Sequence, residues 1–162
     1  MTQPVHVGMA EMVVSRHPAT LITLGLGSCI GLVIFDQISR TAGMVHIMLP
    51  DSRDVKNNPK PGKFADTAVP LLLDELQRLG ANKSQLRAKM AGGAQMFSIP
   101  GKDSAIFSVG NRNVEATLKH LSAEGVKLVA SDTGGSKGRS VEFSTETMKF
   151  IVKTLGSGIK EL

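Results

Sequence analysis

The chain has 162 residues and a formal net charge of +5, and 41% of its residues are hydrophobic. This length and composition favour one folded domain over 1–162 and exclude a disordered chain. A single cysteine excludes an internal disulfide, and the lack of zinc-type Cys/His spacings predicts no metal site, while no cofactor is expected.

The composition also bears on partners and location. The chain has neither Trp nor Tyr, and its 19 Lys and Arg residues are scattered, so we expect no nucleic-acid binding. Apolar runs such as 30–35 are strand-sized and fall short of the roughly 20 residues that span a bilayer, so we expect no membrane insertion. Because 1–14 lacks a basic segment followed by an apolar run, we expect no secretory signal and a cytoplasmic protein.

The first third of the chain has the pattern of short strands. Segments rich in Val, Ile, Leu and Met alternate with Gly, Pro, Asp and Ser, which favour turns. Four strands are predicted, at 9–14, 20–24, 31–36 and 42–48. The segment 51–62 follows, and its prolines and charges predict a surface loop.

The rest of the chain mixes helices with further strands. Apolar residues recur at three- and four-residue spacing from 65 to 79, which predicts an amphipathic helix that Gly80 ends. A second helix is predicted over 113–124, with Asn113 as its cap. Further strands are predicted at 127–130, 141–143 and 148–152. Because the strands come in runs, the pattern favours an α+β class with layered antiparallel or mixed sheets.

A glycine-rich turn at 23–31 carries the only cysteine, Cys29. A dinucleotide-binding fingerprint is nearly excluded, because its third glycine comes one residue late and a strand follows instead of a helix. A nucleophile elbow fits 27–31 literally, but it also requires a following helix, so it stays as the runner-up. A papain-type Cys/His pair, with the turn presenting N–H groups to an oxyanion, fits the strand context best.

Catalysis by Cys29 requires a thiolate, and the N–H dipoles of the glycine turn are expected to lower its pKa. The chain has four histidines, and His46 is the one expected within a strand, on the face opposite Val45 and Ile47. A buried cysteine and a hydrogen-bonded core histidine are the alternative interpretations of the two residues. Arg139 is left open between a surface charge and a substrate contact.

Six segments in order carry a resemblance that covers almost the whole chain. They are TLGLGSC at 23–29, HIMLP at 46–50, KFADTA at 63–68, AKMAGGAQM at 88–96, GNRN at 110–113 and DTGGSKGR at 132–139. In these segments the chain resembles the CheD family of chemoreceptor glutamine deamidases.

The resemblance implies a three-layer α/β/β sandwich with an active site like those of papain and of glutamine-deamidating toxins. It implies a triad of Cys29 as nucleophile, His46 as base and Thr23 as the third member. Around the triad we expect Gly27, Ser28 and the Cys29 N–H near the oxyanion. The glycine pair Gly92 and Gly93 either lines the substrate or forms a tight structural turn.

The resemblance also implies a reaction and partners. Glutamines of methyl-accepting chemotaxis receptors would become glutamates through a cysteine thioester, and some members are credited with receptor methylesterase activity. CheC phosphatase is the implied regulatory partner. The alternative is a binding module that regulates CheC without catalysis, and a weaker option is an enzyme of elbow type, either a free-glutamine amidase or a peptidase.

Overall fold

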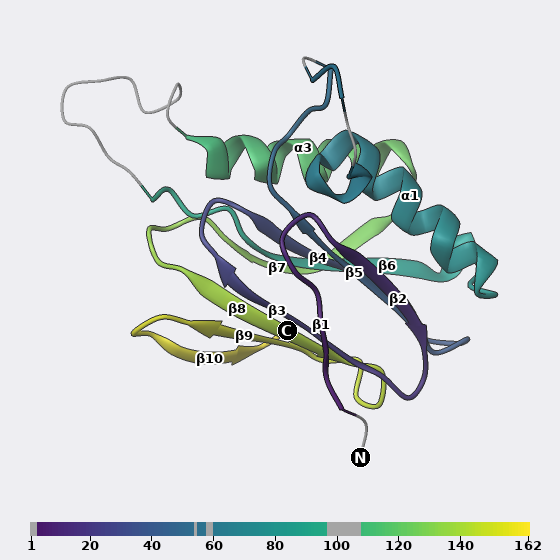
Figure 1. Ribbon diagram of the computed structural model, residues 1–162. Coiled ribbons are helices and arrows are strands. Elements are labelled where there is room, and N and C mark those ends of the chain that lie inside the picture. The colour runs from purple at the N-terminus through teal and green to yellow at the C-terminus, as the bar shows by residue number, and fades with distance from the viewer. Residues whose placement is uncertain (1–2, 54, 58–59, 97–107) are drawn as a thin grey trace, which may run out of the picture.

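Two five-stranded sheets and two α-helices make up the part of the chain that the structure describes, residues 3–53, 55–57, 60–96 and 108–162 of a computed structural model. Figure 1 shows the helices on one face of a central sheet and the second, outer sheet on the other face. This arrangement is α+β and consistent with an α/β sandwich, as the strand runs in the sequence predicted.

The central sheet has the strand order β2-β5-β4-β6-β7. Its strands are β2 (Met12–Arg16), β5 (Thr41–Ile47), β4 (Ile30–Asp36), β6 (Leu86–Gly92) and β7 (Lys127–Thr133). Neighbours are antiparallel except β6 and β7, which run parallel. The sheet is therefore mixed, and every residue of β4 and β5 is buried.

The outer sheet has the strand order β1-β3-β8-β9-β10. Its strands are β1 (Val5–His6), β3 (Thr20–Leu26), β8 (Arg139–Ser144), β9 (Phe150–Thr154) and β10 (Gly158–Glu161). β1 is parallel to β3, and the other pairs are antiparallel. Both edge strands, β1 and β10, are exposed along their whole length.

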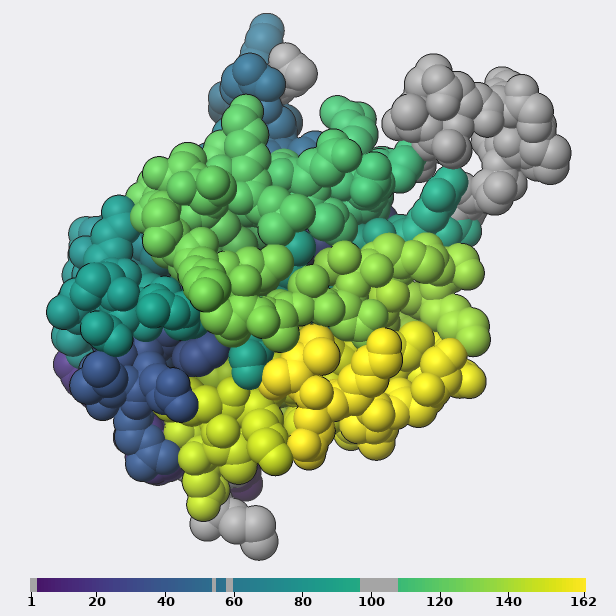
Figure 2. Space-filling model, turned by 180° about the vertical axis from the view of Figure 1, so that it is seen from behind, coloured from purple at the N-terminus to yellow at the C-terminus, as the bar shows by residue number. Residues whose placement is uncertain are grey.

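Helices α1 (Ala65–Arg78) and α3 (Val109–Ala123) cover the central sheet, and short 3₁₀ turns precede α1 (Pro61–Lys63) and β6 (Lys83–Gln85). The predicted apolar stripe of α1 is buried, with Leu72 and Leu76 fully shielded from solvent. From behind, Figure 2 shows α3 in green above the yellow C-terminal strands. None of the helices in the described ranges is long and apolar enough to cross a membrane.

The alternation of side chains along β4 divides the core into two clusters. Leu32 and Ile34 face the helices, whereas Val33 and Phe35 face the outer sheet. There the rings of Phe35 and Phe143 lie 5.0 Å apart. Because successive strand residues point to opposite faces, one strand supplies both clusters and joins the layers.

Some predicted elements differ from the observed ones. The second helix begins at Val109, so Asn113 lies inside it and Ser108 occupies the N-cap position. A Cβ on Gly110 would collide with the backbone of Gly93 and Ala94, so this glycine permits close packing of the helix. The sequence analysis missed β1, β6 and β10. In the predicted 51–62 loop, residues 54 and 58–59 lie outside the described residues.

Candidate active site

Cys29 lies in the turn that leads from β3 of the outer sheet into β4 of the central sheet. The segment after the turn, Ile30–Asp36, is a strand. A nucleophile elbow and a dinucleotide-binding loop both require a helix at this point. The strand therefore shows that the runner-up elbow interpretation is wrong, and it agrees with the strand context that favoured a Cys/His pair.

Thr23 and His46 come from different sheets and meet between them. Thr23 is on β3 and His46 is on β5, and each side chain is about 1% exposed. Thr23 Oγ1 lies 2.8 Å from His46 Nδ1 and donates its own proton to the Val7 carbonyl oxygen at 2.6 Å. The structure thus brings together two of the three residues of the expected triad by a direct hydrogen bond.

These two contacts fix the protonation of the imidazole. The Thr23 hydroxyl has one proton, and Val7 accepts it, so Thr23 Oγ1 must accept the proton of His46 Nδ1. Neutral His46 then carries its lone pair on Nε2. This nitrogen is buried and has no hydrogen-bond partner among the described residues. The free nitrogen is the one that a general base would use.

Cys29 lies on the same side of the central sheet as His46. His46 pairs directly with Gly31, which is two residues after Cys29. Cys29 packs against the cluster between the sheets, where His46 also lies. Cys29 and His46 therefore lie in the same layer between the two sheets, and His46 Nε2 has no hydrogen-bond partner in the described part of the chain.

Gly31, directly opposite His46, lies where the two sheets pack closely. A Cβ on Gly31 would lie 2.9 Å from Leu26 Cδ1 and 3.1 Å from Thr23 Cγ2. These are side-chain atoms of the outer sheet, so the glycine opposite His46 allows the two sheets to pack closely at this point.

Burial sets the charge state of the pair. It raises the pKa of the Cys29 thiol and lowers the pKa of the His46 imidazole, because a desolvated site disfavours the charged form of each. The expectation that the glycine turn lowers the Cys29 pKa is therefore wrong for the unliganded site, where desolvation dominates. The resting pair is a neutral thiol beside a neutral imidazole.

The segment that contains the predicted glycine pair forms backbone hydrogen bonds with the Cys29 turn. The Gly93 N–H donates to the Cys29 carbonyl oxygen at 2.9 Å, and the Ala94 N–H donates to the Gly27 carbonyl oxygen at 2.8 Å. Gly92 and Gly93 are both buried. Their contacts with the backbone are those of a tight structural turn, and a role in lining the substrate stays a prediction.

Arg139 is buried, and its guanidinium group forms hydrogen bonds with the backbone of this glycine segment. Its Nη1 donates to the Gly92 carbonyl oxygen at 2.7 Å and its Nη2 to the Gly134 carbonyl oxygen at 2.6 Å. The side chain is 7% exposed, so the surface-charge interpretation is wrong. Local spacing gave no signal for this role, because the two carbonyl groups come from other segments.

Asn113 is the second support residue that the sequence analysis missed. Its fully buried Nδ2 donates to the carbonyl oxygens of Ser28 at 2.9 Å and Met48 at 3.0 Å. The amide oxygen Oδ1 has no partner among the described residues. An unpaired buried acceptor costs about 1–3 kcal/mol, so this amide is not the most stabilising choice for the position.

The other histidines take no part in the Thr23–His46 hydrogen bond. His6 is exposed in β1, so the expectation that His46 alone lies in a strand is wrong. His17 Nδ1 lies 2.8 Å from Thr145 Oγ1. His120 is in the last turn of α3. Within 3–53, 55–57, 60–96 and 108–162, no group of three or more His, Cys, Asp or Glu residues could hold a metal ion.

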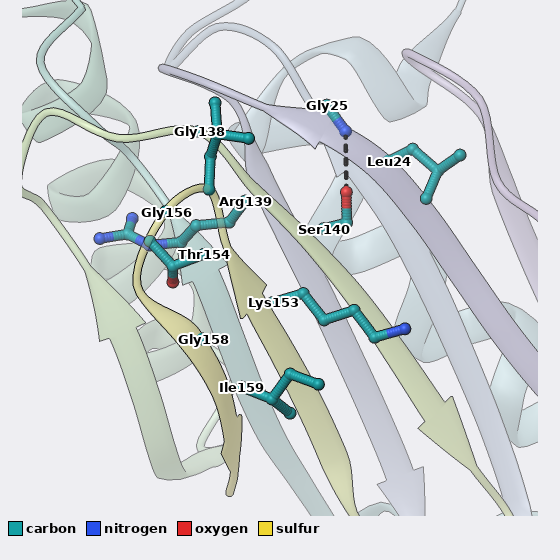
Figure 3. Close-up of a pocket in the computed structure, with 11 residues that line it drawn as sticks. Leu24, Gly25, Gly138, Arg139, Ser140, Lys153, Thr154, Gly156, Gly158 and Ile159 are labelled. Carbon is teal, nitrogen blue, oxygen red and sulfur yellow. Dashed lines mark hydrogen bonds between the residues drawn. The ribbon is translucent and has the colours of Figure 1, made fainter.

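A groove of about 580 Å³ lies on the solvent face of the outer sheet, separate from Cys29. Figure 3 shows Leu24, Lys153 and Ile159 over its strands, with the Gly25 N–H directed at Ser140 Oγ, 3.4 Å away. Leu24 and Thr23 are successive residues of β3, so one faces this groove and the other faces His46. The groove contains neither Cys29 nor His46.

Fold and site together define an α/β sandwich protein with a Cys, a His and a Thr gathered where its two sheets meet. Comparison with known proteins gives the family. The family model described as CheD chemotactic sensory transduction matches residues 48–154. The chain belongs to the CheD family.

Similar proteins match over nearly their full length. A protein of Caldanaerobacter subterraneus subsp. tengcongensis is 48% identical over 95% of this chain and 94% of its own. One of Desulfitobacterium hafniense is 47% identical over 99% of both chains. One of Clostridium novyi is 45% identical over 98% of this chain and 97% of its own. Each is named "Probable chemoreceptor glutamine deamidase CheD".

Proposed function

We propose that this protein is a single-domain glutamine deamidase that acts on glutamine side chains of methyl-accepting chemotaxis receptors. Cys29 is the nucleophile, His46 the general base and Thr23 the residue that orients the imidazole. The observation that carries the proposal is the Thr23–His46 hydrogen bond, which leaves Nε2 of His46 free on the face that Cys29 shares.

The first half of the reaction forms a thioester. His46 Nε2 takes the thiol proton of Cys29 while the sulfur attacks the carboxamide carbon of the substrate glutamine. The carbonyl becomes an oxyanion, and the Cys29 N–H, which has no acceptor among the described residues, donates to it in this proposal. Collapse of this intermediate breaks the C–N bond, and the proton on His46 leaves with the amine as ammonia.

The second half releases glutamate. His46, neutral again, takes a proton from water while the water oxygen attacks the thioester carbon. The C–S bond breaks, and the proton on His46 returns to the sulfur. Because Thr23 is uncharged, it orients the imidazole without stabilising the imidazolium as a carboxylate would. The neutral resting pair fits this arrangement, since charge develops only when substrate is attacked.

The proposal also covers the substrates, the regulatory partner and the type of active site. The similar proteins are named as probable chemoreceptor glutamine deamidases, and we propose that chemoreceptors are the substrates of this protein. By the family resemblance we also propose a site like that of papain and the deamidating toxins, CheC as the regulatory partner and a receptor methylesterase side activity. An excess of positive charge, +5 over the chain, suits acidic receptor surfaces.

The test is to incubate the protein with a receptor cytoplasmic fragment and to measure ammonia and fragment mass. Each converted glutamine adds about one mass unit, because an NH₂ group is replaced by OH. We expect Cys29→Ala and His46→Ala to lower the rate at least about 10⁴-fold. His6→Ala is the matched control, because His6 is exposed and lies outside the site.

Two results would contradict the proposal. Turnover by Cys29→Ala equal to that of the wild type would exclude the cysteine as nucleophile. If wild type and Cys29→Ala both bind purified CheC and neither converts the fragment, the binding-module alternative replaces the deamidase. Assay with free glutamine tests the third option, and we expect no turnover of that amide.

A further inference from the structure

Asn113 joins the two segments that carry the proposed nucleophile and base. It lies in α3, fully buried, and one amide nitrogen donates to the carbonyl oxygens of Ser28 and Met48. Ser28 is the residue before Cys29, and Met48 is two residues after His46. A single side chain from a helix therefore bridges the Cys29 turn and the end of the His46 strand.

The bridge lies where the sheet no longer holds these segments together. The ladder between β4 and β5 ends at the pair Ile30 and Ile47. Beyond it, the Met48 N–H donates to the Lys63 carbonyl oxygen at 2.9 Å, and the Cys29 carbonyl oxygen accepts from Gly93. Each segment is thus bonded to a different neighbour, and the Asn113 amide spans the two.

The orientation of the amide follows from its partners. Both partners are carbonyl oxygens, which only accept, so the NH₂ group must face them. Its two protons serve the two carbonyl groups, while Oδ1 stays buried without a partner among the described residues. An apolar side chain would avoid the unpaired oxygen but could not donate to either carbonyl group.

We propose that Asn113 is a positioning residue that sets the separation of Cys29 Sγ and His46 Nε2. The inference rests on the proposed function. A change of about 1 Å between reacting groups can cost about 10² in rate, so loss of the bridge is expected to lower kcat strongly. KM depends on contacts with the receptor and should change little.

The test uses Asn113→Ala with Asn111→Ala as the matched control. Asn111 is on the same helix, exposed, with its Nδ2 3.4 Å from Glu115 Oε1. At a temperature where thermal unfolding shows each variant folded, we expect Asn113→Ala to lower kcat about 10²-fold and Asn111→Ala to leave it unchanged. Should Asn113→Ala fail to fold, Asn113→Ser replaces it, since one hydroxyl proton serves only one carbonyl group at a time.

A second readout needs no receptor. Cys29 is the only cysteine, so its alkylation by iodoacetamide can be followed against pH. In the otherwise wild-type protein, His46→Ala should slow alkylation of Cys29 near neutral pH by about tenfold. In a protein that already carries Asn113→Ala, the same substitution should slow alkylation by less than about twofold.

The outcomes separate the two proposals. If His46→Ala has no effect in either background, the Cys29/His46 pair itself fails, and the positioning role fails with it. If His46→Ala slows alkylation equally in both backgrounds, or Asn113→Ala keeps the wild-type kcat, the positioning role alone is overturned. A lowered unfolding temperature with unchanged kcat likewise assigns Asn113 a purely structural role.

Discussion

Replacing Gly92 with alanine should lower activity mainly by displacing Cys29, and only to a lesser extent by unfolding the protein. Gly92 has a φ of +112°, and a Cβ on it would collide with the Cys29 carbonyl oxygen. Normal C···O contacts are about 3.3 Å or longer, so the two backbones must separate by about 1 Å. A displacement of this size at the proposed nucleophile is expected to lower kcat by about 10²-fold. The positive φ adds about 1–3 kcal/mol of strain.

Gly80→Ala separates the two effects. Gly80 has a φ of +104°, close to that of Gly92, but its added Cβ would meet nothing within 4 Å. Both variants should lose stability in urea titrations because of the positive φ, and Gly92→Ala should lose more because of the collision. The deamidation rate per folded molecule should fall only for Gly92→Ala. If both variants keep the wild-type kcat, the argument that Gly92 holds Cys29 in place is refuted.

Three further predictions concern the proposed triad and the core. Thr23→Val removes the acceptor of His46 Nδ1 and should lower kcat about 10- to 100-fold, whereas Thr41→Val, which is equally buried, should not change it. Burial holds the pKa of His46 in the folded protein below its ordinary 6.5, so the unfolded chain binds the proton at higher pH and the free energy of unfolding should fall as pH drops below 6.5. The urea midpoints measured at about pH 7 and pH 5.5 should therefore differ less for His46→Gln than for the wild type. Leu72→Ala, fully buried in α1, should cost about 2–5 kcal/mol in urea titrations, and an altered kcat per folded molecule would contradict its assignment to the core alone.

Several features followed from local sequence patterns. The three- and four-residue spacing of apolar residues gave the buried stripe of α1, because a helix repeats every 3.6 residues. Alternation placed His46 on the face opposite Val45 and Ile47, which the two core clusters confirm. The strand that follows Cys29 was also expected from its run of apolar residues.

Other features of the fold could not be predicted from local patterns. β6 contains Arg87 and Lys89 at alternate positions and residues of low β propensity, and it forms because it pairs with β4 and β7. β1 and β10 are short, exposed edge strands with little apolar signal. Such strands depend on partners distant in sequence, which a local window does not contain.

The sequence by itself determined the family, the single cysteine in a turn between strands and the face on which His46 lies. Tertiary structure alone decided that Thr23 meets His46, that burial raises the Cys29 pKa and that Asn113 bonds both Ser28 and Met48. Each of these depends on the stacking of two sheets and a helix. Spacing along a strand or helix fixes the direction of a side chain, but hydrogen bonds and desolvation depend on which distant segments pack against it.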